Sequence, residues 1–159
     1  MLELSGGIDY IALRDKFREA FPYVNAIAVN QTIGTGAWTD ISTFASVADP
    51  WAFRDTGTPA NFNIRPTRGI WAINAIAIWE NDAGVTGDRG VRIVNNSGTT
   101  LAVLYVPVGA SGDSSLTCNN EIVVFTGTYM KLQVFQSSGG DLDVTQGAIQ
   151  LRYRGPSRV

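Results

Sequence analysis

The chain has 159 residues, which is enough for one domain with its own hydrophobic core. Its formal charge of −2 gives no reason to expect a nucleic acid or a membrane surface as a partner. It contains no histidine, which excludes Ser-His-Asp and Cys-His catalysis and the usual zinc ligand sets. The single cysteine, Cys118, has no partner for an internal disulfide, and we interpret it as a small buried residue. We expect neither a signal peptide nor a membrane-spanning segment, because no stretch has the required basic start or apolar length.

The first 24 residues differ in pattern from the rest. Apolar residues at helical spacing predict a helix over about 8–21, and Pro22 stands just beyond its end. An isolated helix of this length is marginal in water, so its apolar side must pack on something. Two interpretations are open: the helix packs on its own domain, or it anchors the chain in a partner or a three-helix neck. The candidate anchor residues are Ile8, Ile11, Leu13, Phe17 and Phe21.

From residue 25 onward the pattern changes to short runs of β-branched and aromatic residues, separated by Gly, Asn, Asp, Ser and Pro. We therefore divide the chain into an N-terminal segment, 1–24, and a head domain, 25–159. Ten short strands with turn residues between them indicate an all-β antiparallel sandwich or jelly roll. The predicted strands are 25–30, 38–46, 50–54, 60–65, 69–79, 89–95, 99–106, 121–126, 128–136 and 147–154.

The most informative strand covers residues 70–79, in which Asn74 is the only polar residue. A strand with one face in water should alternate apolar and polar residues, as 129–136 and 148–154 do. Both faces of 70–79 are apolar, so both must be covered. In a small β protein the simplest second cover is another copy of the same chain, and the strand therefore predicts an oligomer.

Three predicted loops are long and polar: 80–88, 107–120 and 137–146. Binding residues concentrate on such loops. Their carboxylates suggest a calcium site, but the spacing does not match an EF-hand, and solvated turn residues explain them more simply. Six aromatic residues either stack on sugars or, for most of them, belong to the core or an interface: Trp38, Trp51, Phe53, Trp71, Trp79 and Tyr105. The candidate ligand contacts are Trp51, Asp82, Asp88, Asp113 and Asp141, and no catalytic or metal-binding set is predicted.

An ordered series of short motifs resembles a known family. It covers residues 60–154 well and 25–60 loosely, and no single motif in it is diagnostic. The series resembles the jelly-roll heads related to the globular domain of complement component one q and to tumour necrosis factor, in the variant common in bacteriophage virion proteins. The residues that carry it are Phe62 to Ile64, Arg68-Gly69, Trp71 to Trp79, Asn81, Gly84, Arg89, Arg92-Ile93, Asn95 to Gly98, Leu132 to Gly140, Leu142, Val144 and Ile149 to Arg154.

The resemblance implies a ten-strand jelly roll that assembles as a three-fold trimer and has no enzymatic activity. Strand 70–79 would then line the three-fold axis. Apart from the resemblance, the arginines at 89, 92, 152 and 154 either pair with carboxylates across subunits or are single exposed charges. Some relatives bind calcium near the trimer apex, so Ca²⁺ stays a possible ligand. The interface residues that we predict are Ile70, Ala72, Ile76, Ile78, Trp79 and Arg89.

The resemblance also implies a function. We expect a structural protein of a bacteriophage particle, assembled in the host cytoplasm, that decorates or projects from the virion surface. Residues 1–24 would attach it to capsid or tail proteins. The alternative is a receptor-binding module whose outer loops contact a glycan or protein on the host surface.

Overall fold

The computed structural model describes residues 22–63, 68–80, 86–108, 115–125 and 127–157. This part of the chain is all β, which agrees with the predicted fold class. The predicted helix, and with it the anchor residues Ile8, Ile11, Leu13, Phe17 and Phe21, lies outside the described residues. The strands are β1 (Tyr23–Ile33), β2 (Thr39–Asp40), β3 (Phe44–Ala48), β4 (Phe62–Asn63), β5 (Gly69–Trp79), β6 (Gly87–Asn95), β7 (Thr100–Val108), β8 (Ser115–Val124), β9 (Tyr129–Gln136) and β10 (Leu142–Gly155).

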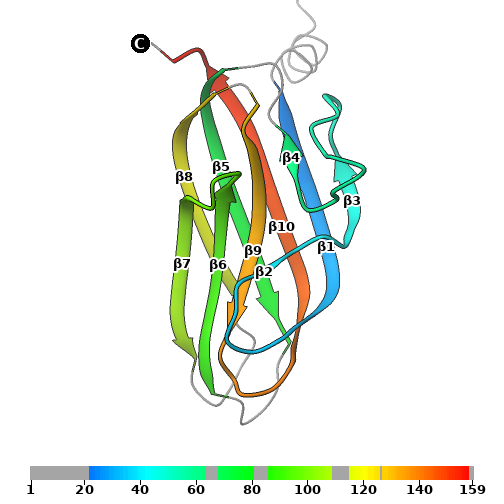
Figure 1. Ribbon diagram of the computed structural model, residues 1–159, viewed down its shortest axis with the longest axis vertical. Coiled ribbons are helices and arrows are strands. Elements are labelled where there is room, and N and C mark those ends of the chain that lie inside the picture. Colours follow the sequence, from blue (N-terminus) through cyan, green and yellow to red (C-terminus); the bar gives the residue numbers. More distant parts are fainter. Residues whose placement is uncertain (1–21, 64–67, 81–85, 109–114, 126, 158–159) are drawn as a thin grey trace, which may run out of the picture.

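The strands form two antiparallel sheets that face each other (Figure 1). The first sheet has the order β3-β1-β10-β5-β8. The second has the order β2-β9-β6-β7, and β4 also pairs with β9. Neighbouring strands in these orders are mostly far apart in sequence, which is the connectivity of a jelly roll rather than of a simple meander.

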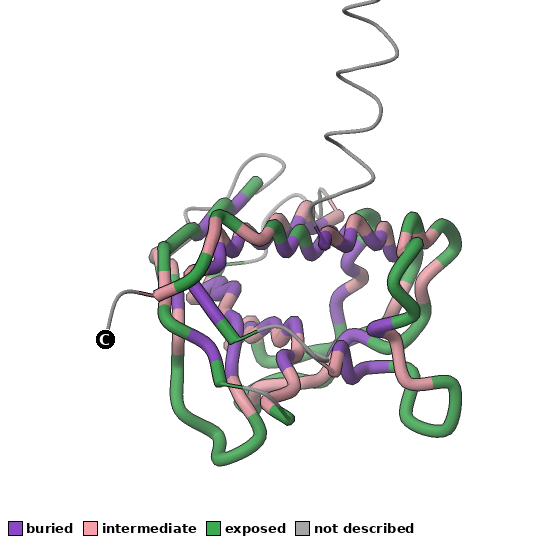
Figure 2. Tube along the Cα trace, turned by 90° about the horizontal axis from the view of Figure 1, so that it is seen from above, coloured by how far each residue is buried: buried purple, intermediate pink, exposed green. Residues whose placement is uncertain are grey.

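The hydrophobic core fills the space between the two sheets, and Figure 2 shows buried residues along both layers. Alternation along the strands produces it: in β9, Met130, Leu132 and Val134 are fully buried while the residues between them are half-buried. Cys118 is also buried, as predicted, and burial raises the pKa of its thiol to about 11.

Two predicted strands, 50–54 and 38–46, differ in kind from the structure. Residues 50–54 form a turn rather than a strand, because Asp49 accepts hydrogen bonds from the backbone amides of Ala52 (3.1 Å) and Arg54 (2.7 Å). The predicted strand 38–46 is two strands, β2 and β3, which belong to different sheets. Such a switch of sheet leaves the local residue preferences unchanged, so the sequence pattern did not reveal it.

The predicted loops 107–120 and 137–146 are shorter than expected. β8 begins at Ser115 rather than at 121, and β10 begins at Leu142 rather than at 147. The early part of β8 alternates buried Leu116 and Cys118 with exposed Thr117 and Asn119. The exposed polar half of this alternation made the segment look like a loop. β1 begins at Tyr23, two residues before the predicted strand 25–30.

Candidate functional site

The two faces of β5 are different, and only one of them belongs to the core. Its odd-numbered positions, including Trp71 and Ile73, are buried between the sheets. Its even-numbered positions are half-buried and lie on the outer face of the first sheet. The structure therefore places four predicted interface residues on that outer face: Ile70, Ala72, Ile76 and Ile78.

The other two predicted interface residues, Trp79 and Arg89, are buried within a single chain. Trp79 is 1% exposed and Arg89 is 4% exposed, and the Arg89 guanidinium lies 5.7 Å from the centre of the Trp79 ring. Arg89 Nη1 also donates to the carbonyl oxygen of Asp88 (3.1 Å). Burial lowers the pKa of Arg89, and the Coulomb attraction of Asp88 opposes this change. These two residues were assigned wrongly, because the odd position of Trp79 points it into the core.

The outer face of the first sheet is organised in rows of residues that lie opposite one another on neighbouring strands. One row is apolar except for its last member: Ile27, Ala148, Ile76 and Thr117. Ile27 and Ile76 are half-buried, so their side chains keep part of their surface in solvent. In the next row, the exposed Val29 on β1 and Ile78 on β5 lie on either side of the polar Gln146 on β10.

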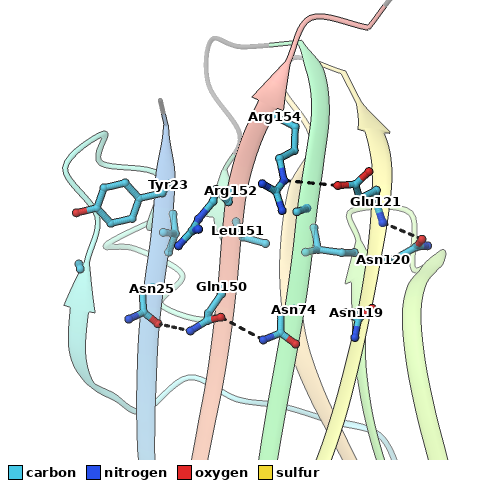
Figure 3. A pocket seen from close by; sticks show the side chains of 14 residues that line it. Tyr23, Asn25, Asn74, Asn119, Asn120, Glu121, Gln150, Leu151, Arg152 and Arg154 are labelled. Carbon is cyan, nitrogen blue, oxygen red and sulfur yellow. Dashed lines mark hydrogen bonds and ion pairs between the residues drawn. The ribbon is translucent and has the colours of Figure 1, made fainter. Parts of the chain in front are cut away.

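The next row on the same face is made of side-chain amides. Asn25, Gln150, Asn74 and Asn119 lie opposite one another on β1, β10, β5 and β8. Asn74 Nδ2 donates to Gln150 Oε1 (3.1 Å), and Gln150 Nε2 donates to Asn25 Oδ1 (3.3 Å) (Figure 3). Among the described residues, the buried Oδ1 of Asn74 accepts no hydrogen bond.

Beyond the amide row, charged residues surround a pocket of about 620 Å³. Tyr23, Arg152, Ala72 and Glu121 form the row next to the amides. Arg154 Nε lies 3.5 Å from Glu121 Oε1, and both side chains are mostly exposed (Figure 3). These groups donate and accept hydrogen bonds, but they include no nucleophile paired with a base.

The predicted ligand contacts do not gather at this face. Trp51 is 40% exposed in the turn after β3, as expected of a contact residue. Asp88 lies at the start of β6, where its Oδ2 accepts from the hydroxyl of Tyr105 (2.8 Å), and Asp141 is exposed just before β10. Asp82 and Asp113 lie outside the described residues.

Neither a metal site nor a membrane helix is found in the part of the chain that the structure describes. Its His, Cys, Asp and Glu residues form no group of three or more that is placed to hold a metal ion. The same residues include no helix that is long and apolar enough to cross a membrane.

The residues that make this face polar could not be recognised from the sequence pattern. Asn25, Asn119 and Gln150 come from three strands that are distant in sequence, and only the register of the sheet brings them into one row. One signal was present: Asn74 is the single polar residue in an otherwise apolar strand. A lone amide at that position indicates a specific hydrogen-bonding partner.

A comparison with known proteins identifies the type of fold. No protein-family model matches the chain, and no curated protein matches it in sequence. Among solved structures, the globular domain of a zebrafish complement 1qA protein matches with a TM-score of 0.58 and 12% sequence identity, over 83% of this chain and 95% of that chain. At this identity the likeness concerns the fold alone. The chain therefore has the jelly-roll fold of the C1q globular domain.

Proposed function

We propose that the chain is a non-enzymatic assembly module in which three copies pack through the outer face of the first sheet. The observation that carries this proposal is the outer side of β5, where Ile70, Ala72, Ile76 and Ile78 leave apolar surface in contact with water. Contiguous apolar surface of this kind is typical of an interface between proteins. The family resemblance in the sequence supports three copies rather than two.

Burying the apolar surface of this face on assembly would give a gross hydrophobic gain. If each copy buries roughly 300 Å² of apolar surface, the gross gain is about 7 kcal/mol before the entropic costs of association. The amide row adds specificity, because each amide buried at the interface needs a hydrogen-bonding partner and only some registers supply one.

Self-assembly is tested by replacing Ile76 with aspartate. We expect the unmodified protein to have three times the mass of its 17.1 kDa chain in light scattering, and Ile76→Asp to have the mass of one chain, because a carboxylate at the interface would be desolvated without a partner. Val103→Asp is the matched control: Val103 is 52% exposed on the second sheet and should not affect the mass. A single-chain mass for the unmodified protein, or an unchanged mass for Ile76→Asp, contradicts the proposal.

The second part of the proposal concerns the particle in which the protein is located. We propose that the trimeric head decorates or projects from a bacteriophage particle, to which residues 1–24 attach it. The support is the family resemblance in the sequence and a face suited to assembly. We expect particles purified on a density gradient to contain the chain, and a labelled antibody against the head to bind their surface. Particles without the chain contradict this location and leave the assembly proposal intact.

A receptor-binding role is the second candidate function. It is favoured by exposed aromatic residues that lie away from the proposed interface: Trp51 is 40% exposed and Tyr105 is 47% exposed. Exposed aromatic side chains are enriched where proteins bind partners and ligands. In this role the assembled head would present several copies of one weak site, and avidity would strengthen attachment.

A further inference from the structure

Three aromatic side chains lie in one row across the outer face of the second sheet, opposite the proposed interface. Tyr105 on β7 and Phe135 on β9 both pair with Gly90 on β6, which stands between them. Trp38 comes directly before β2, and its ring centre lies 5.5 Å from that of Phe135. We call Trp38, Phe135 and Tyr105 the aromatic platform.

The three rings of the aromatic platform pack side by side over Gly90. The ring centres of Tyr105 and Phe135 are 5.4 Å apart, with the ring planes tilted by 40°. A Cβ atom at Gly90 would lie 2.7 Å from the Trp38 ring and 3.0 Å from the Tyr105 ring, so the rings rest almost on the backbone. Because Tyr105 is 47% exposed while Trp38 and Phe135 are partly exposed, the aromatic platform presents apolar surface to solvent.

Polar side chains lie on both sides of the aromatic platform. On one side, Asp88 Oδ2 accepts from the Tyr105 hydroxyl (2.8 Å). On the other, the Arg92 guanidinium lies 4.2 Å from the centre of the Trp38 ring, and its Nε donates to Gln133 Oε1 (2.8 Å). Among the described residues, Gln133 is the only acceptor bonded to this guanidinium, and the nearby Asp40 attracts it by its charge. The two terminal nitrogens keep N–H groups that can donate to a ligand on the aromatic platform.

The four charged side chains beside the aromatic platform have a net charge of zero. Arg92 and Lys131 are positive, while Asp40 and Asp88 are negative, and Lys131 Nζ already pairs with Asp40 Oδ2 (2.7 Å). A nucleic acid or another polyanion would need an excess of positive charge here. The composition of the site therefore favours a neutral ligand that has both an apolar face and hydrogen-bonding groups at its edge.

We propose that the aromatic platform binds a hexopyranose ring of a neutral saccharide. Aromatic rings carry partial negative charge on their faces, and the axial C–H groups of such a sugar carry partial positive charge. Hydroxyl groups at the edge of the sugar donate to the Asp88 carboxylate and accept from the terminal nitrogens of Arg92. A few polar groups around an aromatic surface are the usual make-up of a small-ligand site.

This site rests on the proposed receptor-binding role, for which it supplies a saccharide as the ligand. It does not depend on self-assembly. It lies on the second sheet, whereas the proposed interface lies on the first sheet, so a trimer would leave it open. Failure of saccharide binding would therefore leave the assembly proposal standing, and a monomeric protein would still be able to bind.

The test is saturation-transfer NMR on the full chain, with lactose, cellobiose and N,N′-diacetylchitobiose as the probes at millimolar concentration. We expect at least one probe to receive saturation, most strongly at its axial ring protons. Tyr105→Ala should weaken binding about tenfold, because it removes the most exposed ring. Phe125→Ala is the matched control: Phe125 is 57% exposed but lies after β8, outside the platform, and its removal should leave binding unchanged.

Three results would overturn the proposal. The first is the absence of saturation transfer to all three probes. The second is binding by Tyr105→Ala that equals binding by the unmodified protein. The third is a change of mass for Tyr105→Ala in light scattering, since this would show that the platform is a contact between copies of the chain rather than a saccharide site.

Discussion

Replacing Trp71 with alanine will lower the free energy of unfolding by about 3–5 kcal/mol. Trp71 is fully buried between the sheets near the start of β5, with edge-on ring contacts to Phe53 (5.7 Å between centres) and Tyr153 (5.5 Å). Its indole Nε1 donates to no acceptor in the described chain, so the cost comes from lost packing and from the cavity. The surrounding strands are paired on both sides and cannot collapse fully into that space.

Urea unfolding at one fixed protein concentration measures this loss. The concentration must be fixed because self-assembly would add to the apparent stability of every variant. Trp51→Ala is the control, since Trp51 is 40% exposed and its removal should change the free energy by less than about 0.5 kcal/mol. If the two variants lose the same amount of stability, Trp71 is not the packing centre that the structure indicates.

The second large effect is expected at Gln136, a fully buried amide at the end of β9. Its Nε2 donates to the carbonyl oxygens of Ile33 (2.9 Å) and Gly140 (2.6 Å), and its Oε1 accepts from the backbone amide of Ser138 (2.7 Å). Gln136→Leu fills a similar volume but leaves these backbone groups without partners. We expect a loss of about 2–4 kcal/mol in the free energy of unfolding.

Gln136→Glu separates hydrogen bonding from packing, because the two side chains have the same shape. A carboxylate would face the two carbonyl oxygens, so the folded state raises the pKa of this introduced group. Stability relative to the unmodified protein is then highest in mild acid, where the group is protonated, and falls as the pH rises toward neutrality. Urea unfolding at several pH values measures this, with Gln136→Leu as the reference without a titrating group. A pH-independent difference between Gln136→Glu and Gln136→Leu contradicts this interpretation.

Much of the fold was predictable from local pattern. Strands with one face in water, such as β9, show a clear alternation of apolar and polar residues. Strand β5, which is apolar on both faces, begins and ends within one residue of its prediction. The errors have a common physical cause. Turn 50–54 and the start of β8 depend on side-chain hydrogen bonds and on register with distant strands, which residue preferences do not contain.

The candidate site was predictable only in its apolar part. Ile70, Ala72, Ile76 and Ile78 share one face because a strand alternates with a period of two. Trp79 has the opposite parity, and Arg89 is buried against it. The amide row and the aromatic platform each combine side chains from several strands, so they exist only once the sheets are paired.

The position of β10 has a consequence for how the protein is made. This strand is the last of the ten described, yet it lies between β1 and β5 in the middle of the first sheet (Figure 1). During synthesis, β1 and β5 leave the ribosome long before the strand that joins them, and each then exposes an unpaired edge. Long-range pairing of this kind slows folding and prolongs the exposure of those edges to aggregation. Residues 142–155 thus decide when the nascent chain becomes a closed sandwich.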